Sequence, residues 1–385
     1  MKSFLIGIVS LLICNSSFSQ VMYRAYPSDV LGIERNIKVL KPRNYAENPE
    51  KTYPLVIVLD GDFLFEPVAG NVDYLSYWDQ MPESFVVGIN QRESRVDETA
   101  VNNDSGFPEP QSAEFMDFIM EVHQTMEDEF RIAPFSIIVG KDITANLATF
   151  FLMRKKVPFK AFINIDPDYS ELIEKNLITK ISKMQEQQYY YVAMAGNSTA
   201  GDQVFNKSVD SLLSSKDNIH LKYDKIENVD KYGLGAHAIP RALTYIFQEY
   251  KLVDTKQLVA DLASKTSTAD SKDPATALKE LKEKYTFIKE VYGIDMRMRL
   301  VDIVTIAEFY IDNKDYDGLL EVADVAMIEY PDLLYGRFIE GLGYEGIGRI
   351  PRAIKSYNAA FELQPAVGLT KDDVLDKVEM LQEKE

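Results

Sequence analysis

Short apolar runs alternate with amphipathic segments along the first two thirds of the chain. Between about residues 30 and 252 the apolar runs are continuous and rich in β-branched and aromatic side chains, as strands covered on both faces are. The clearest predicted strands are residues 55–59, 85–89, 135–139, 161–165 and 189–194, with an antiparallel edge strand over 33–40. Helical periodicity falls between them, near residues 112–129, 144–155, 202–214 and 240–251. This alternation predicts an α/β fold around a mostly parallel sheet.

The pattern changes after residue 252. Residues 253–274 are rich in small polar side chains and predict a linker. Residues 275–385 show helical periodicity throughout, and three pairs of residues recur 34 positions apart: Tyr310 and Tyr344, Ala326 and Ala360, and Pro331 and Pro365. That spacing is the period of the tetratricopeptide (TPR) repeat. A small all-α, TPR-like domain is therefore predicted, with helices near 276–291 and 370–383 packed at its ends.

The second copy of this repeat is the clearer one. It has small, aromatic and terminating residues at Gly341, Tyr344, Gly348, Ala353, Tyr357, Ala360 and Pro365. Small residues let two helices approach closely, and the proline ends the second helix. The helices either form a groove that binds a partner protein or only dock onto the preceding domain.

The amino terminus resembles a signal peptide. A basic residue, Lys2, precedes an apolar run that is too short to span a bilayer, and Ser17 and Ser19 suit cleavage before Gln20. Residues 1–19 are therefore predicted to direct export to the periplasm or the exterior, the alternative being a buried first strand. Residues 11–14 also resemble a lipoprotein box, but Ile13 is bulky where a small residue is needed, which disfavours a lipid anchor on Cys14.

Composition narrows the possible functions. Hydrophobic residues make up 46% and charged residues 26% of the 385, as in globular proteins with a large core. The net charge of −18 disfavours binding to nucleic acid or to anionic lipid. Cys14 is the only cysteine, so a chain cleaved after residue 19 has no disulfide, thiol nucleophile or cysteine-ligated metal.

Several segments resemble the enterochelin esterase and esterase D group of α/β hydrolases. Residues 31–42 resemble the opening strand pair of that group, and residues 53–61 its strand that ends in Asp-Gly. Residues 87–90 with Arg92, Arg95 and Asp97 resemble the next strand and an arginine–aspartate loop, and residues 235–243 the histidine loop with its helix. The resemblance implies an α/β-hydrolase domain over residues 20–252, which acts on carboxylic esters.

The same resemblance assigns the site. The nucleophile elbow falls on residues 140–144, where Asp142 occupies the position of the serine, and His237 occupies the position of the catalytic histidine. Backbone amides of Gly61, Asp62 and Ile143 would form the oxyanion hole. The acid should follow Gly196, where residues 197–200 read Asn-Ser-Thr-Ala; Asp202 is a weak candidate that better suits a helix start.

Two interpretations of Asp142 follow. It is either a carboxylate nucleophile, as in other α/β hydrolases that form a covalent ester, or a residue of an inactive cleft. Thr144 and Ala145 replace the glycines expected after the nucleophile, and the acid is missing, so the sequence favours a pseudoenzyme that binds another envelope or secreted protein through residues 275–385. An active carboxylic-ester hydrolase that uses Asp142 or an unrecognised serine is the alternative, and a ligand-binding module without turnover is a third.

The remaining polar residues offer weaker evidence for a functional site. Asp166-Pro167-Asp168 is read as a turn rather than a metal site, and neither a metal nor a cofactor is expected. His123 and His220 are expected to be surface side chains. Ser136 precedes the elbow on a strand and is a poor substitute nucleophile.

Overall fold

The computed structural model describes residues 20–196, 218–259 and 275–383, and the chain divides into two compact units between Gln248 and Glu249. The predicted signal peptide, the predicted helix over 202–214 and Asp202 lie outside the described residues. No helix in the described ranges combines the length and apolar character needed to cross a membrane.

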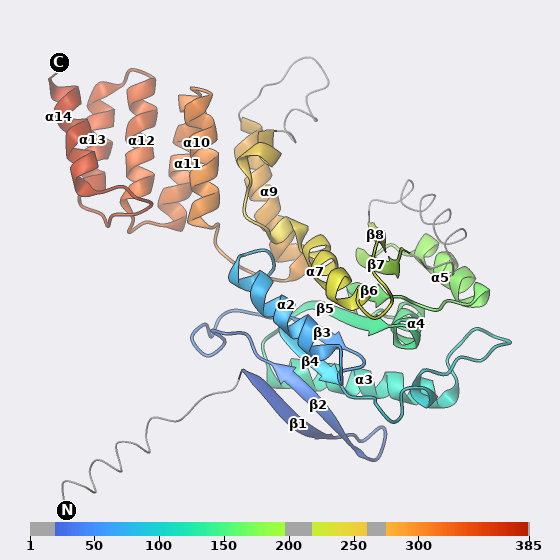
Figure 1. Ribbon diagram of the computed structural model, residues 1–385. Helices are drawn as coiled ribbons and strands as arrows, with labels where there is room; N and C mark the ends of the chain where they lie inside the picture. Colours follow the sequence, from blue (N-terminus) through green and yellow to red (C-terminus); the bar gives the residue numbers. More distant parts are fainter. Residues whose placement is uncertain (1–19, 197–217, 260–274, 384–385) are drawn as a thin grey trace, which may run out of the picture. The chain divides into compact units, whose positions relative to one another are not determined.

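The first unit is built on an eight-stranded sheet, in the order β1-β2-β4-β3-β5-β6-β7-β8 (Figure 1). β1 and β2 pair antiparallel, β2 joins β4 antiparallel, and every other pairing is parallel. The strands are β1 (Val21–Pro27), β2 (Glu34–Leu40), β3 (Tyr53–Val58), β4 (Phe85–Ile89), β5 (Ile132–Lys141), β6 (Ala161–Ile165), β7 (Gln188–Ala195) and β8 (Ile219–Ile226). The predicted α/β class with a mostly parallel sheet is confirmed.

Helices cover both faces of this sheet, which explains why its central strands are apolar without alternation. α2 (Phe65–Tyr77) and α7 (Leu234–Ile246) pack together on one face. The other face carries α3 (Pro110–Glu129), α4 (Ile143–Phe150) and α5 (Glu171–Lys183), whose buried side chains form one apolar cluster with the strands. Short 3-10 helices follow at Asp97–Thr99, Phe151–Met153 and Gln248–Tyr250.

The prediction of an edge strand over 33–40 is wrong in its position within the sheet. β2 lies between β1 and β4, and Val21–Pro27 forms the outer strand. That outer strand has one buried residue in seven, so its sequence lacks the apolar signal of the inner strands. The α7 helix also begins six residues before the predicted residue 240, because Pro240 is accommodated inside it rather than at its start.

The second unit contains α9 (Ala275–Tyr292), α10 (Leu300–Asp312), α11 (Tyr316–Glu329), α12 (Leu334–Gly346), α13 (Ile350–Phe361) and α14 (Lys371–Gln382). Consecutive helices from α10 to α14 pack side by side. Glycines bring them together: a Cβ on Gly341 would collide with the Tyr357 ring, and one on Gly346 with the Tyr316 ring. The C-terminal helical region is thus confirmed, and its tetratricopeptide identity stays a prediction.

Candidate functional site

The elbow lies where β5 passes into α4. Asp142 has φ 60° and ψ −126°, outside the regions that non-glycine residues usually adopt. Its backbone N–H donates to the carbonyl oxygen of Ile165, and its own carbonyl accepts from Ala145. A Cβ at Gly140 would lie 2.6 Å from the carbonyl oxygen of Thr144, so the strand and the helix pass as closely here as glycine allows. The sharp strand-to-helix turn is present although its central residue is an aspartate.

The Asp142 carboxylate faces a guanidinium. Its side chain is 48% exposed, and Oδ2 lies 3.9 Å from Nη1 of Arg95. Arg95 also donates from Nη2 to the carbonyl oxygen of Lys141, at 2.9 Å. The residue at the nucleophile position is therefore held next to a positive charge that is itself fixed to the turn.

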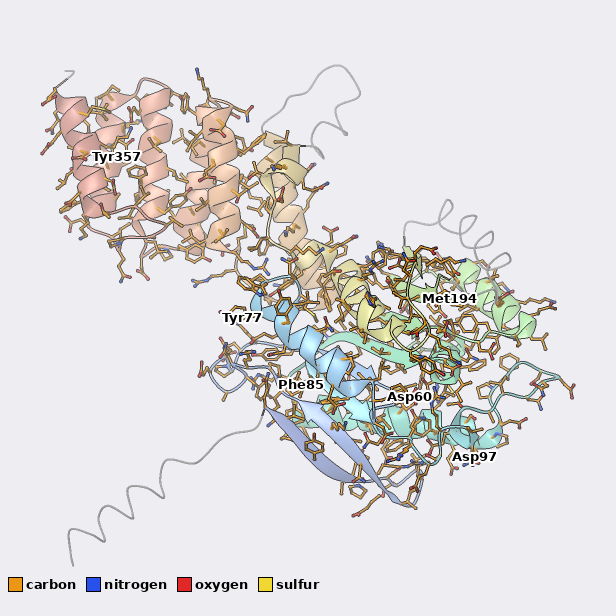
Figure 2. All side chains as sticks on the ribbon, viewed as in Figure 1. Asp60, Tyr77, Phe85, Asp97, Met194 and Tyr357 are labelled. Atoms are coloured by element: carbon orange, nitrogen blue, oxygen red, sulfur yellow. The ribbon has the colours of Figure 1, made fainter. Side chains whose placement is uncertain are left out.

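Asp60 fixes that guanidinium in place. It follows β3 with φ 55°, is 1% exposed, and accepts from Nε and Nη2 of Arg95 at 2.6 and 3.1 Å. Gln91 holds the Asp60 backbone by accepting from its N–H at 3.0 Å. Burial raises the pKa of the Asp60 carboxyl, and the hydrogen bonds from Arg95 and Thr144 oppose that rise. Figure 2 labels Asp60, which lies in the first unit.

Thr144 connects Asp60 to the elbow. Its hydroxyl donates to Oδ2 of Asp60 at 2.7 Å and accepts from the N–H of Lys141 at 2.8 Å. The side chain is fully buried. A threonine in place of the expected glycine therefore does not open the turn; it adds a hydrogen bond between α4 and the end of β3.

Of the three backbone amides expected in an oxyanion hole, one already donates a hydrogen bond within the protein and two do not, among the described residues. The Gly61 N–H donates to the carbonyl oxygen of Ile89 at 2.8 Å, so it is already engaged. The N–H groups of Asp62 and Ile143 donate to no acceptor among the described residues. The Asp62 side chain accepts from the N–H groups of Gln91 and Arg92 at 2.7 and 3.0 Å, which fixes this loop beside β4.

His237 lies in the first turn of α7 and is exposed. Its imidazole forms no hydrogen bond or ion pair with any of the described residues. The other candidate for the triad, Asp202, lies outside the described residues. Within the part of the chain that the structure describes, the elbow and the histidine are thus not joined by a hydrogen bond.

His123 is not a surface side chain, contrary to the sequence-based expectation. It is 6% exposed on α3, and its Nε2 lies 2.9 Å from the hydroxyl of Ser136, which is itself 4% exposed on β5. Glu127 approaches Nδ1 at 3.6 Å, and burial lowers the pKa of the imidazole. Because the serine and the histidine are both covered, this Ser–His contact is structural. His220 is half-buried and stacks on the ring of Tyr189.

The sequence marked Asp60, Arg95 and Thr144, but it did not indicate the hydrogen bonds that join Asp60 to the other two. Asp60 and Arg95 were each marked by the resemblance, but their pairing depends on the adjacency of β3 and β4. The available signal was an acidic residue directly after one strand and an arginine in the loop after the neighbouring strand. Among the described residues, no group of three or more His, Cys, Asp or Glu side chains is arranged to hold a metal ion.

Comparisons with known proteins agree with this architecture. A crystal structure of an uncharacterised protein from Capnocytophaga ochracea DSM 7271 matches with a TM-score of 0.80 and 21% identity, over 94% of this chain and all of that one. A crystal structure of an IroE-like serine hydrolase from Shewanella oneidensis matches with a TM-score of 0.58 and 16% identity, over 79% of this chain and 98% of that one. No protein-family model and no curated protein matches the sequence.

Likenesses at this level of identity establish the fold. The first match extends over 94% of the chain, so it necessarily includes helices of the second unit. The second is to a protein described as a serine hydrolase, whereas the elbow of this chain holds Asp142. The chain has the α/β-hydrolase fold, followed by a C-terminal helical region.

Proposed function

We propose that this chain is an exported pseudoenzyme that has an esterase-like α/β-hydrolase domain and binds a protein partner through its TPR-like helices. The main support for a loss of catalysis is the environment of Asp142. Its carboxylate lies 3.9 Å from Arg95, and that guanidinium is held by a buried aspartate on its other side.

A carboxylate so placed is a poor nucleophile for an ester. The adjacent positive charge stabilises the anion and lowers its tendency to attack. Attack of a carboxylate on an acyl carbonyl would also produce a mixed anhydride, which is higher in energy than the ester from which it forms. Carboxylate nucleophiles in this fold are suited to attack on saturated carbon, which gives a stable ester instead.

His237 supports the same proposal. A catalytic histidine needs a partner that fixes its tautomer and orientation, and loss of that partner alone costs about 10⁴ in rate. The residues that follow Gly196, where that partner should stand, read Asn-Ser-Thr-Ala and include no carboxylate.

The alternative is an active hydrolase. What favours it is the elbow itself: Asp142 is kept in an unusual backbone conformation, and the N–H of Ile143 is open among the described residues. Backbone strain of this kind costs of order 1–3 kcal/mol and often marks a site in use. An enzyme that uses Asp142 would attack saturated carbon, and an enzyme that uses an unrecognised serine would react with a fluorophosphonate.

Labelling with a fluorophosphonate probe separates the pseudoenzyme from a serine hydrolase. The proposal expects the intact mass of the full chain to stay unchanged after prolonged incubation with the probe. A stoichiometric adduct on any serine would reject the pseudoenzyme and identify the nucleophile.

The partner is expected to be an envelope or secreted protein, because the signal-like residues 1–19 predict export. Cross-linking in cells followed by purification should capture the same protein with the full chain and not with a chain lacking residues 275–385. Circular dichroism of the shortened chain verifies that the sheet domain remains folded. Equal capture by both chains would assign the interface to the first unit and reject the role of the helices.

A further inference from the structure

Exposed aromatic side chains occur along α2 and at both of its ends. Tyr74 and Tyr77 in the helix, Phe63 in the turn before it and Trp78 directly after it are 63%, 65%, 51% and 57% exposed. The opposite side of the helix is an ordinary buried face, formed by Phe65, Val68, Ala69, Val72 and Leu75. Figure 2 labels Tyr77 at the end of this helix. Several large exposed aromatic residues on one helix and at its ends form the kind of surface that marks an interaction site.

Gly70 lies near the middle of α2 and has no evident reason to be a glycine within the chain. A Cβ built at this position meets no atom within 4 Å. Alanine is favoured over glycine in a helix interior by roughly fivefold per position. A glycine that weakens its own helix and faces open space is explained when another backbone must approach it closely.

The spacing around Gly70 is symmetric. Phe63 precedes it by seven residues and Tyr77 follows it by seven, whereas Glu66 and Tyr74 stand four residues before and after it. These five residues are the α2 stripe. Within α2, Glu66, Gly70, Tyr74 and Tyr77 are three or four residues apart and share the exposed side of the helix, whereas Phe63 lies in the turn that leads into it. A stripe that reads similarly from both ends around a small residue suits antiparallel packing against itself.

We propose that α2 packs antiparallel against α2 of a second copy of this chain, with Gly70 of each copy at the twofold axis. A twofold interface brings each residue opposite its symmetric counterpart, so Phe63 of one copy meets Tyr77 of the other. Aromatic rings in this arrangement gain from offset or edge contacts in addition to burial. The absence of a side chain at Gly70 lets the two backbones come close enough for those rings to interlock.

Glu66, the charged residue of the stripe, also gains a hydrogen bond in this pairing. Oε1 of Glu66 accepts from the buried Lys38 at 2.5 Å, and Oε2 has no partner among the described residues. In the antiparallel pair, Glu66 of one copy stands opposite Tyr74 of the other, whose hydroxyl can donate to Oε2. This hydrogen bond fixes the register of the two helices.

The expected dimer is reversible. The four aromatic side chains each bury about 150–250 Å² when fully covered, so half of that area gives roughly 400 Å² per copy. A stable standard interface buries about 800 Å² per partner. The pairing is therefore expected in the micromolar range rather than the nanomolar range, and it is independent of the function proposed for the elbow.

A cysteine at the twofold axis tests the geometry. Gly70→Cys in a Cys14→Ser background should oxidise to a covalent dimer, because two residues at the axis fall within the about 4.4–6.8 Å between Cα atoms that a disulfide needs. Ala113→Cys in the same background is the matched control, since Ala113 is exposed on α3, which covers the opposite face of the sheet. Cross-linking of Gly70→Cys no faster than the control would overturn the proposal.

Sedimentation equilibrium of the uncross-linked full chain tests the energetics. Gly70→Ala, at the centre of the interface, and Tyr77→Glu, which removes an aromatic contact, should each raise the dimer dissociation constant by about tenfold or more. Gly70→Ala should leave the melting temperature of the dilute monomer unchanged or raised, because the added Cβ meets nothing within the chain. A wild-type chain that stays monomeric at about 100 μM, far above the range expected for this area, would show that something other than a second copy covers the stripe.

Discussion

Nη1 of Arg95 lies 3.9 Å from Oδ2 of Asp142, while Nε of the same guanidinium donates to the buried Asp60 at 2.6 Å. One arginine thus joins the end of β3, the loop after β4 and the elbow after β5. The elbow of this α/β-hydrolase fold is held by a polar network that needs no nucleophilic serine. This explains how the turn persists with an aspartate at its centre.

Replacement of Arg95 by methionine should destabilise the first unit by about 3 kcal/mol. Truncating one partner of a buried ion pair leaves the other charge uncompensated, and the low end of the usual range applies because Arg95 is still 23% exposed. Urea unfolding measures the change in midpoint at constant slope. Arg92→Met, at an exposed position three residues away, should alter the free energy of unfolding by less than about 0.5 kcal/mol. Equal effects of both variants would contradict the central place of Arg95.

Gly140→Ala should destabilise the elbow by about 1–3 kcal/mol. The new Cβ would lie 2.6 Å from the Thr144 carbonyl oxygen and 2.7 Å from the Ala145 nitrogen, and both are backbone atoms that cannot move alone. Thermal unfolding followed by circular dichroism measures the loss. Gly235→Ala is the matched control: its Cβ would meet only Leu64 at 3.7 Å, so this variant should be neutral or slightly stabilising.

Gly341→Ala and Gly346→Ala should each destabilise the helical unit by about 1–2 kcal/mol. Overpacking against a tyrosine ring costs about 1–3 kcal/mol, of which the better helix propensity of alanine recovers up to about 1. Calorimetry of the full chain should show a lower transition temperature for the second unit. Asn358→Ala, at an exposed position of α13, should not lower it. A neutral outcome for both glycines would reject the close helix packing.

Stability should fall as the pH drops from about 7.5 to 5, and His123 should contribute to that fall. Burial lowers the pKa of His123 in the folded protein, so the unfolded chain binds more protons between the folded pKa and the ordinary value of about 6.5. The stabilisation is complete above that ordinary value and is lost as the pH falls through the window below it. His220 adds to the loss, since burial lowers its pKa as well.

The variant His123→Gln isolates the contribution of that residue. It should be less stable at pH 7.5 by about 1–3 kcal/mol, because the Ser136 hydroxyl loses its partner. Its melting temperature should also change less between pH 7.5 and 5 than that of the wild-type protein. The same pH dependence in both proteins would exclude His123 as a contributor.

The inner strands could be predicted from the sequence because burial on both faces leaves a continuous apolar run. β4 and β6 have the residue limits that the pattern indicated, 85–89 and 161–165. β1 was not predicted, because an outer strand with one buried residue has no continuous apolar run. α2 was not predicted for a related reason. Its exposed side carries Tyr74 and Tyr77, so the sequence shows little contrast in hydrophobicity between the two faces of the helix.

The site was predictable only in part. Asp142 and Gly140 could be found because the elbow is a local turn within a few consecutive residues. The bonds from Asp60 to Arg95 and Thr144 join positions 35 and 84 residues apart, and only the strand order brings those positions together. The burial of His123 was missed because the acidic neighbours Glu121 and Glu127 suggested a solvated helix face, whereas the histidine itself lies on the side that packs against Phe159.

Hydrolysis of a short-chain p-nitrophenyl ester by the purified full chain tests most directly whether the elbow is inactive. Asp142→Ala and His237→Ala serve as comparisons under identical conditions. If the elbow is inactive, the wild-type protein and both variants release p-nitrophenol at one common rate, that of the uncatalysed reaction. A wild-type rate well above it that is lost in the Asp142→Ala and His237→Ala variants would show instead that the elbow is catalytic.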